Sequence, residues 1–323
     1  MVKKHMHPDT MAFRSEMLKN IRDFFYKKEY LEVDTPLLSP LIIPETTIEL
    51  FKTRMKDPYG TDKELYLLPS PEYWHKKLIA SGNSRNFFQM AKAFRNSEQT
   101  GPLHNIEFTM LEWYSLNADY RDSLGLAKEL LQDISVKING EFLQFSTMQV
   151  REACKRFASL DLDALQEPEK MKAEAERRGH RIPDGESWND MFNRIWVSEV
   201  EPELPDDNPL FLTDYPAQIP CLAKLTPDGR YRQRWELYWK GMELANCYTE
   251  ETDPGGVKRY METEGKEKNR SALIKADWDT GFWTNFSTAY PDVSGAALGV
   301  DRLIMAFLGC NDISEVIYFP VTD

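Results

Sequence analysis

Reactive side chains are concentrated in residues 94–114, FRNSEQTGPLHNIEFTMLEWY. This run predicts a hairpin, in which one strand ends at Arg95, a polar loop with Gly and Pro follows, and a second strand returns. Side chains alternate along a strand, so Phe108 and Glu112 share one face, and a buried carboxylate on such a face needs a partner. A solvated sheet face would explain Glu112 alone, but Arg95, His104 and Phe108 in the same hairpin favour a functional site.

A second run, residues 235–250 (WELYWKGMELANCYTE), carries glutamates on a predicted hairpin. If Lys240 and Gly241 form a two-residue turn, Glu236 and Glu243 lie diagonally on one face. Two neighbouring carboxylates repel each other and need a cation, and oxygen ligands suit Mg²⁺.

The end of the same run points to the other face of a regular strand. Asn246, Tyr248 and Glu250 alternate on the face opposite to Glu243, so a shared pocket requires a β-bulge between Glu243 and Asn246. An unbroken ladder would contradict the shared pocket. Ordinary exposed glutamates on a hairpin are the alternative interpretation.

A third run, residues 295–302 (GAALGVDR), has small side chains on one face of a predicted strand. Gly295, Ala297 and Gly299 alternate, so that face is nearly bare and allows a ligand or another backbone to approach closely. Arg302 follows at the start of a helix, where an arginine can reach a phosphate. Glycine-rich strand ends are common, so this run carries weight in combination with the other two.

The elements that position these residues are predicted from hydrophobic periodicity. Strands are predicted over residues 30–36, 64–68, 86–94, 106–114, 210–214, 233–239, 242–249 and the first part of 295–308. Helices are predicted over residues 10–28 and about 256–268, within the charged region 121–200, and at the end of 295–308. Asp9 or Thr10 can cap the first helix. Strands near both ends with helices between them favour an α+β domain with a mainly antiparallel sheet.

Composition limits the classes of protein to consider. The 323 residues carry 40 Lys and Arg against 52 Asp and Glu, a net charge of −12, and 41% are hydrophobic. This excludes a disordered chain, a collagen-like repeat and a coiled-coil rod, and no apolar run approaches the ~20 residues of a membrane span. The acidic balance argues against a nucleic-acid footprint. Four cysteines without a C-x-x-C pair, and five histidines that do not cluster with them, favour reduced cytosolic thiols over disulfides or zinc.

Taken together, these runs resemble the motifs of class II aminoacyl-tRNA synthetases, in particular the lysyl-tRNA synthetase subgroup. FRNSE…HNIEFTMLEWY resembles motif 2, GAALGVDRL resembles motif 3, and residues 30–36 (YLEVDTP) resemble the dimer-forming motif 1. Residues 70–78 (SPEYWHKKL) and 243–250 (ELANCYTE) are similar to that subgroup's amino-acid pocket. The resemblance implies the class II synthetase catalytic fold, in which a mainly antiparallel sheet is flanked by helices. It also implies a homodimer in the cytoplasm, with residues 1–323 as a single catalytic domain and a helix-rich insertion at about 121–205.

The resemblance implies a role for each matching position. Arg95 and Arg302 would be the catalytic residues, which stabilise charge while an amino-acid carboxylate attacks ATP. The implied ATP site consists of Arg95, Glu98, His104, Phe108, Glu236, Glu243, Gly299 and Arg302. Within it, Glu236 and Glu243 would hold Mg²⁺. The implied amino-acid site consists of Glu72, Glu112, Tyr114, Asn246, Tyr248, Glu250 and Ala297. The acids of that site suit a substrate with two ammonium groups.

Two departures from the lysyl-tRNA synthetase pattern change the expected substrate. Those synthetases carry an N-terminal OB-fold domain that binds the anticodon, whereas motif 1 begins here near residue 30, and Ala297 stands where they carry glycine. Such a paralogue is similar to the elongation factor P lysine ligases, which activate (R)-β-lysine, or lysine less well, and attach it to a lysine of elongation factor P. We therefore expect an ATP-dependent ligase that forms an aminoacyl-adenylate and acts on elongation factor P, with no tRNA or membrane partner.

Three alternatives share parts of this pattern. A tRNA-charging enzyme or a free amino-acid ligase would use the same site chemistry. A catalytically inactive amino-acid-sensing paralogue would belong to a different functional class. The presence of Arg95, Glu236, Glu243 and Arg302 disfavours the inactive paralogue, because such a protein has no chemical reason to keep them.

Overall fold

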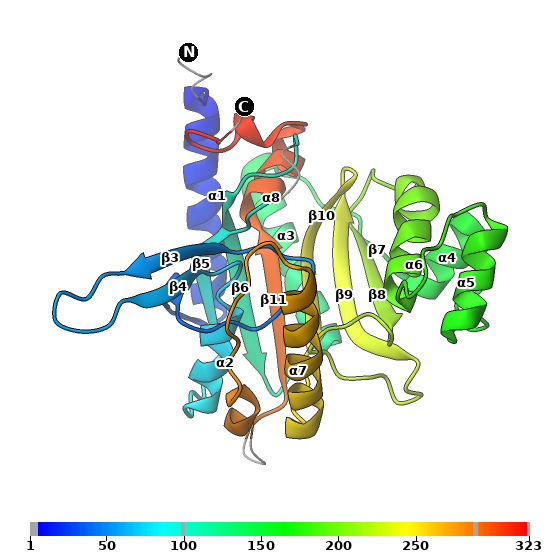
Figure 1. Cartoon of the computed structure of the whole chain (residues 1–323). Helices are drawn as coiled ribbons and strands as arrows, with labels where there is room; N and C mark the ends of the chain where they lie inside the picture. The colour runs from blue at the N-terminus through cyan, green and yellow to red at the C-terminus, as the bar shows by residue number, and fades with distance from the viewer. Residues whose placement is uncertain (1–5, 98–100, 287–289, 322–323) are drawn as a thin grey trace.

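The computed structural model describes residues 6–97, 101–286 and 290–321 of the chain. Their strands form an eight-stranded sheet in the order β1-β5-β6-β11-β10-β9-β8-β7 and a three-stranded sheet in the order β2-β4-β3, which projects from one side of the molecule (Figure 1). The strands are β1 (Leu31–Glu32), β2 (Leu38–Ser39), β3 (Phe51–Met55), β4 (Lys63–Leu67), β5 (Phe87–Phe94), β6 (Glu107–Leu116), β7 (Ser146–Gln149), β8 (Leu210–Pro216), β9 (Tyr231–Trp239), β10 (Met242–Thr249) and β11 (Val293–Gly299).

The large sheet is antiparallel through its centre. Parallel pairs occur at its two ends, between β1 and β5 and between β7 and β8. The α-helices are α1 (Pro8–Lys27), α2 (Glu72–Ala80), α3 (Tyr120–Asn139), α4 (Val150–Ala158), α5 (Pro168–Arg177), α6 (Trp188–Ile195), α7 (Pro254–Ser271) and α8 (Val300–Leu308). The predicted α+β fold with a mainly antiparallel sheet is therefore confirmed.

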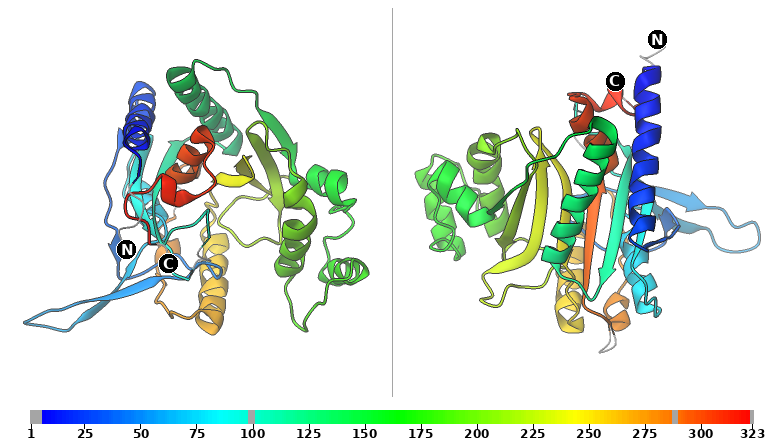
Figure 2. Two further views of the ribbon diagram at one scale, coloured as in Figure 1. Left: turned by 90° about the horizontal axis from the view of Figure 1, so that it is seen from above. Right: turned by 180° about the vertical axis from the view of Figure 1, so that it is seen from behind.

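One face of the large sheet is dry and carries the main hydrophobic core. A row of cross-strand partners on this face consists of Phe88, Trp113, Ala296, Cys247 and Trp235. The helices α1, α3 and α8 cover the row, as the view from behind in Figure 2 shows. Burial of a large apolar side chain in this row, such as Phe88, stabilises the sheet by about 1.5–3 kcal/mol.

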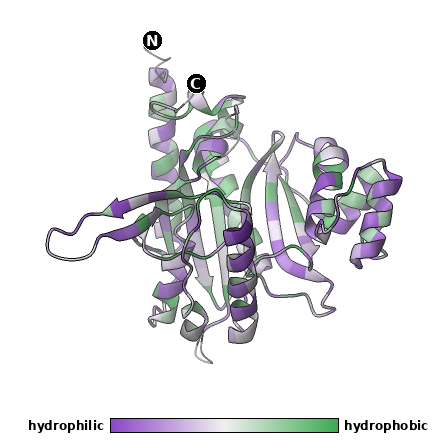
Figure 3. Ribbon diagram, in the orientation of Figure 1, coloured by the Kyte–Doolittle hydropathy of each residue, from purple (hydrophilic) through white to green (hydrophobic). Residues whose placement is uncertain are grey.

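The opposite face is more open. The helices α2 and α7 flank it near β5, β6 and β11, while α4, α5 and α6 form a separate apolar cluster against β8. Figure 3 shows hydrophilic residues along α7 and on the projecting β3–β4 arm. The sheet face between these helices is the surface on which the site is built. None of the helices in the described ranges combines the length and the apolar character needed to cross a membrane.

Some element boundaries differ from the sequence prediction. The first helix begins at Pro8, and its N-cap is His7, whose side chain accepts a hydrogen bond from the backbone N–H of Asp9, rather than Asp9 or Thr10. The predicted strand at residues 30–36 shortens to β1, whose pairing with β5 ends at Glu32. The short strands β2, β3 and β7 were not predicted.

A buried ion pair joins the first helix to the last one. Arg14 Nη1 donates to Asp301 Oδ1 at 2.5 Å and to the Val316 carbonyl at 2.9 Å. Arg14 Nη2 donates to Thr109 Oγ1 at 3.0 Å, and the Thr109 N–H donates to Asp301 Oδ2 at 2.6 Å. Because the Arg14 and Asp301 side chains are only 7% and 3% exposed, the pair ties α1, β6, α8 and the C-terminal segment together without competition from water.

We expect Arg14→Met to lower the free energy of unfolding by about 3–5 kcal/mol, because it leaves the Asp301 carboxylate buried without its cation. Chemical denaturation followed by circular dichroism measures the change. The matched control is Arg22→Met, which breaks the half-exposed Arg22–Glu32 pair and should cost no more than about 1 kcal/mol. Equal losses in the two variants would contradict the structural role of the Arg14–Asp301 pair.

Candidate active site

Polar side chains form two rows across the open face of the large sheet. Residues that pair across antiparallel strands point to the same face, so the strand register decides which side chains become neighbours. The first row consists of Gln89, Glu112, Ala297, Asn246 and Glu236. The second row consists of Phe87, Tyr114, Gly295, Tyr248 and Arg234. The rows bring together residues from all three sequence runs that were singled out for their chemistry.

The hairpin of β9 and β10 contains the predicted β-bulge. Tyr238 pairs with Glu243, and the turn residues Lys240 and Gly241 both have positive φ, of 54° and 70°, as a type I′ turn requires. The register then shifts between Glu243 and Ala245. The shift removes the parity conflict, so Glu243 and Asn246 both lie on the open face.

Two adjoining cavities lie on this face. The larger has a volume of about 630 Å³ and is bounded by residues of α6 and α7 in addition to the two rows. The smaller has a volume of about 110 Å³ and shares Arg95, Asn246 and Ala297 with the larger one. A ligand with two chemically different ends can therefore span both cavities.

The two cavities separate the predicted residues into two groups. The larger cavity is lined by every residue predicted for the amino-acid site, namely Glu72, Glu112, Tyr114, Asn246, Tyr248, Glu250 and Ala297. The smaller cavity is lined by most of those predicted for ATP, namely Arg95, His104, Phe108, Glu243, Gly299 and Arg302. Glu236 lines the larger cavity, and Glu98 lies outside the described residues.

A lysine that the sequence analysis missed lies at the acidic end of the larger cavity. Lys76 Nζ is 2.7 Å from Glu72 Oε1 and 2.8 Å from Glu250 Oε2, and its side chain is 1% exposed. The Tyr248 hydroxyl donates to the same Glu72 oxygen at 2.6 Å. Although burial alone would lower it, the two carboxylates raise the pKa of Lys76 above its ordinary value. The helical spacing of Glu72 and Lys76 was the available signal for this contact.

Glu250 keeps one oxygen without a partner. It is 1% exposed, and its Oε1 atom has no hydrogen bond within the described part of the chain. Burial raises the pKa of Glu250 to about 8, against the lowering effect of the Lys76 ammonium. A buried carboxylate oxygen in this position favours a cationic ligand, since a positive charge would satisfy it and stabilise its ionised form.

Glu112, in the middle of the first row, is also held by a neighbour that the sequence analysis did not select. Its Oε2 atom is 2.9 Å from Nδ1 of His75, a side chain of α2. Burial raises the pKa of Glu112, while the hydrogen bond and the charge of His75 lower it.

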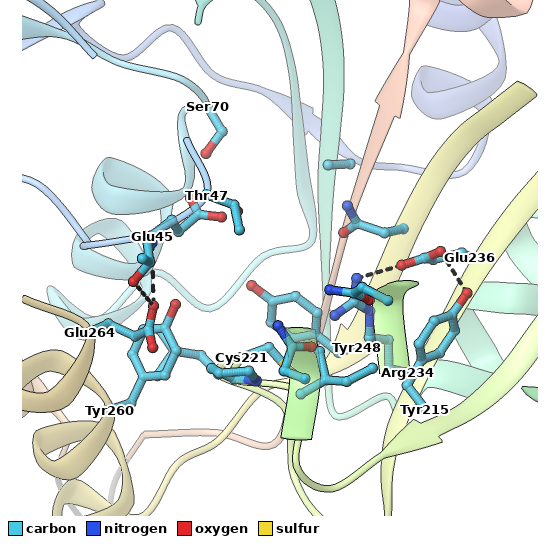
Figure 4. A pocket seen from close by; sticks show the side chains of 18 of the residues that line it. Glu45, Thr47, Ser70, Tyr215, Cys221, Arg234, Glu236, Tyr248, Tyr260 and Glu264 are labelled. Carbon is cyan, nitrogen blue, oxygen red and sulfur yellow. Dashed lines mark hydrogen bonds and ion pairs between the residues drawn. The ribbon is translucent and has the colours of Figure 1, made fainter. Parts of the chain in front are cut away.

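Glu236 is engaged on both of its oxygens. Arg234 Nη2 donates to Oε1 at 2.5 Å, and the Tyr215 and Tyr238 hydroxyls donate to Oε2 at 2.5 and 3.1 Å. Figure 4 shows Tyr215 and Arg234 reaching Glu236 on one side of the cavity, with Glu45, Tyr260 and Glu264 on the other. Arg234 and Tyr215 were not predicted, and their strand positions gave no distinctive sequence signal.

The carboxylates Glu236 and Glu243 fit a divalent cation in part. Burial and the charge of Glu236 raise the pKa of Glu243 to about 7, although the charge of Arg302 lowers it. A cation bound nearby would lower the pKa of Glu243 and stabilise its carboxylate form. In the described residues no group of three or more His, Cys, Asp or Glu side chains forms a metal site by itself. A magnesium ion at this place would therefore need phosphate oxygens as further ligands, which is how proteins commonly hold Mg²⁺.

Two arginines with constrained positions line the smaller cavity. Arg302 donates from Nε to the Leu103 carbonyl at 3.1 Å and from Nη1 to the Glu243 carbonyl at 2.9 Å. The Arg95 guanidinium lies 5.2 Å from the centre of the Phe108 ring. A cavity lined by an aromatic ring and two guanidinium groups suits a ligand with a flat ring and phosphates.

Known proteins are similar to this chain over nearly its whole length. The family model of the class II tRNA synthetases (D, K and N) matches residues 1–323. The elongation factor P–(R)-β-lysine ligase of Hamiltonella defensa is 36% identical over 313 residues, which cover 95% of this chain and 94% of that protein. The homolog of this ligase in Aquifex aeolicus is 38% identical over 299 residues, 92% of this chain and 94% of that protein. The ligase of Haemophilus influenzae is 33% identical over 310 residues, 95% and 94% of the two chains.

We expect Gly295→Ala to displace Glu250. A Cβ atom at Gly295 would lie 2.4 Å from Glu250 Oε1 and 2.7 Å from Tyr114 Cε1, and such overpacking typically costs about 1–3 kcal/mol. The matched control is Gly299→Ala, where the nearest atom would be the Leu244 carbonyl oxygen at 3.7 Å, an ordinary contact. Chemical denaturation of both variants checks the prediction, and a larger loss of stability in Gly299→Ala would contradict it.

Proposed function

The chain belongs to the class II tRNA synthetase family, and from this premise we propose that it is an ATP-dependent ligase that attaches lysine or (R)-β-lysine to a lysine side chain of elongation factor P. The observation that carries the proposal is the pair of adjoining cavities, one lined by acids and one by arginines and an aromatic ring. Relatives named as elongation factor P–(R)-β-lysine ligases, similar over almost their whole length, support this choice of substrates.

The proposed reaction has two steps. The amino-acid carboxylate attacks the α-phosphorus of ATP, and pyrophosphate leaves, which gives an aminoacyl-adenylate. The amine of the acceptor lysine then attacks the acyl carbon, an amide bond forms, AMP leaves and the amine loses a proton. Neither step needs a nucleophilic side chain, so catalysis depends on the placement of the reactants and on the stabilisation of developing charge.

Arg95 and Arg302 are the proposed catalytic residues. Arg95 lines both cavities, so its guanidinium can contact the α-phosphate and the attacking carboxylate together. Arg302 is fixed by two backbone carbonyls and would bind the far end of the triphosphate. His104, Phe108 and Gly299 complete the proposed nucleotide site, with the Phe108 ring as the stacking surface for adenine.

Magnesium is the proposed metal ion, with Glu236 and Glu243 as its protein ligands. When bound, Mg²⁺ neutralises phosphate charge in the reaction. Glu243 contributes a carboxylate whose pKa is raised by burial and by the charge of Glu236, so a bound cation would stabilise its ionised form. Glu236 contributes an orientation fixed by Arg234, Tyr215 and Tyr238.

The acidic cavity is the proposed amino-acid site. Glu72, Glu112 and Glu250 provide three carboxylates against one lysine, Lys76, so the cluster favours a substrate with more than one ammonium group. Tyr114, Asn246 and Tyr248 lie between the acids as neutral hydrogen-bonding groups, and Ala297 shapes the floor between the two cavities. We keep both lysine and (R)-β-lysine in the proposal, because each presents a carboxylate and two ammonium groups.

The wider assignments are part of the same proposal. An acidic cavity in a chain with a net charge of −12 supports a lysine-bearing protein as the acceptor rather than tRNA, because phosphate contacts supply most nucleic-acid affinity. We propose a homodimer formed through the segment around β1 and a location in the cytoplasm. Residues 1–323 are proposed to form one catalytic domain with a helical insertion at about 121–205.

The first test combines exchange and transfer. We expect the protein to catalyse ATP–pyrophosphate exchange that depends on lysine or (R)-β-lysine, and to increase the mass of purified elongation factor P by one lysyl or β-lysyl group. Arg95→Ala should abolish the exchange while the circular dichroism spectrum stays unchanged. If exchange occurs and tRNA is charged while elongation factor P stays unmodified, the acceptor is tRNA and the proposed acceptor is wrong. If no amino acid supports exchange, the proposed function is refuted.

A second test separates the two cavities. We expect Glu250→Gln to raise the KM for lysine in the exchange assay about tenfold or more, because a hydrogen bond to a charged group is lost together with a charge pair. The KM for ATP should change less than about threefold, since Glu250 does not line the smaller cavity. Equal effects on the two constants would argue against Glu250 as an amino-acid ligand.

A further inference from the structure

A buried histidine lies beneath the amino-acid cavity without a role in the proposed reaction. His75 belongs to α2 and is fully buried. Its two ring nitrogens contact two different strands: Nδ1 is 2.9 Å from Glu112 Oε2 on β6, and Nε2 is 2.8 Å from Gln89 Oε1 on β5. The same Gln89 oxygen accepts a hydrogen bond from Thr35 Oγ1 at 2.9 Å. His75 is therefore the middle member of a chain that runs from Thr35 to the cavity.

The geometry requires a proton between His75 and Glu112. A neutral imidazole has one N–H and one lone pair, whereas a carboxylate is an acceptor only. If both ring nitrogens face acceptors, either His75 is an imidazolium that donates to both, or Glu112 carries a proton and donates to Nδ1. If the Gln89 amide is turned over and donates to Nε2, Nδ1 carries the N–H. In each arrangement a proton lies in the Nδ1···Oε2 contact.

This contact leaves the second oxygen of Glu112 for the cavity. Glu112 lines the larger cavity, and within the described residues its carboxylate is hydrogen-bonded through Oε2, to His75. The His75 ring is itself held by edge-on contacts with Phe87 and Tyr114, with ring centres 5.2 and 5.3 Å away. The imidazole thus has little freedom to turn, and its hydrogen bond limits the rotation of the Glu112 carboxylate.

We propose that His75 is a positioning residue of the amino-acid site, which fixes Glu112 through Nδ1 so that Oε1 faces an ammonium group of the substrate. This inference rests on the proposed function for the identity of the substrate. It goes beyond that function because His75 does not line the cavity and is proposed to act through Glu112.

The charges around Glu112 give the proposal a dependence on pH. Glu112 faces His75, Glu72 and Lys76 from α2, Tyr114 from its own strand and Glu250 from the strand β10 region. Burial raises the pKa of Glu112, whereas His75 and, to a smaller extent, Lys76 lower it, so removal of His75 should raise the pKa of Glu112 further. A protonated Glu112 has no charge to offer an ammonium group. As the pH is lowered, a variant without His75 should therefore lose affinity for the amino acid at a higher pH than the unmodified protein does.

Two substitutions separate the roles of the two ring nitrogens. The amide nitrogen of asparagine can take the place of Nδ1 and keep the hydrogen bond to Glu112, whereas that of glutamine reaches towards the place of Nε2 and Gln89. We expect His75→Gln to weaken lysine binding about tenfold or more and His75→Asn to stay within about threefold of the unmodified protein. Isothermal titration of the full-length protein with lysine, between pH 6 and 9, measures both affinities.

The pH profile and a double-mutant cycle provide the decisive controls. The decline of lysine affinity at low pH should begin at a higher pH in His75→Gln than in the unmodified protein. If His75 acts through Glu112, His75→Gln should change lysine affinity less than about twofold when Glu112→Gln is already present. Equal effects of His75→Gln in both backgrounds, an unchanged affinity in His75→Gln, or equal losses in His75→Asn and His75→Gln would overturn the proposal.

Binding and exchange distinguish this inference from the proposed function. Lysine binding that follows the expected order of variants, without ATP–pyrophosphate exchange, would refute the function and support the role of His75. If the unmodified protein catalyses exchange and His75→Gln binds lysine as tightly as it does, the function is supported and the role of His75 is refuted. Failure of the unmodified protein to bind lysine or (R)-β-lysine would overturn both. Thermal unfolding of each variant identifies a loss of fold, in which case His75→Asn, the smaller change at Nδ1, decides the outcome.

Discussion

Burial of several carboxylates on one face of a sheet is the constraint from which the rest of the site follows. An isolated buried charge is too unfavourable to persist, so each acid requires a partner supplied by the fold. Lys76 lies between Glu72 and Glu250, and Arg234 binds Glu236. The neutralisation is incomplete, because Glu250 keeps an oxygen without a hydrogen bond in the described structure. A cluster that is fixed in place and short of positive charge is pre-organised for a cationic ligand.

Strand register connects this polar face to the stability of the protein. Trp113 and Trp235 point into the dry core, while their sequence neighbours Glu112 and Glu236 point into the cavity. A slip of one residue would exchange the two sets, so the packing of the large apolar side chains also fixes the acids. The β-bulge after Glu243 alters this alternation locally and adds an acid to the face without disturbing Trp235. Core packing and site geometry are thus two consequences of one register.

Features set by local sequence were predictable, and features set by docking were not. Alternation along a strand is local, so the faces of Glu112 and Asn246 and the need for a bulge followed from the residues alone. Lys76 and His75, by contrast, were not singled out within the stretch 70–78, and their contacts arise only when α2 packs against β6 and the residue that follows β10. The four-residue strand β7 escaped prediction because its parallel pairing with β8 leaves no local pattern. The roles proposed for the site residues depend on ligands and remain predictions.

The docking of α2 brings to the acidic cluster both an acid, Glu72, and the lysine that partly neutralises it, Lys76. Glu72, His75 and Lys76 are spaced three and four residues apart, so they share one face of the helix and reach the sheet together. The other side of the helix is anchored to Asp279, which accepts a hydrogen bond from the Tyr73 hydroxyl at 3.0 Å and pairs with Lys77 at 2.7 Å. A rotation of α2 would withdraw Lys76 from Glu250 and His75 from Glu112 in one movement. Removing one partner of a buried pair costs about 3–5 kcal/mol. The buried pairs therefore stabilise the position of α2 on the sheet as well as the positions of the acids.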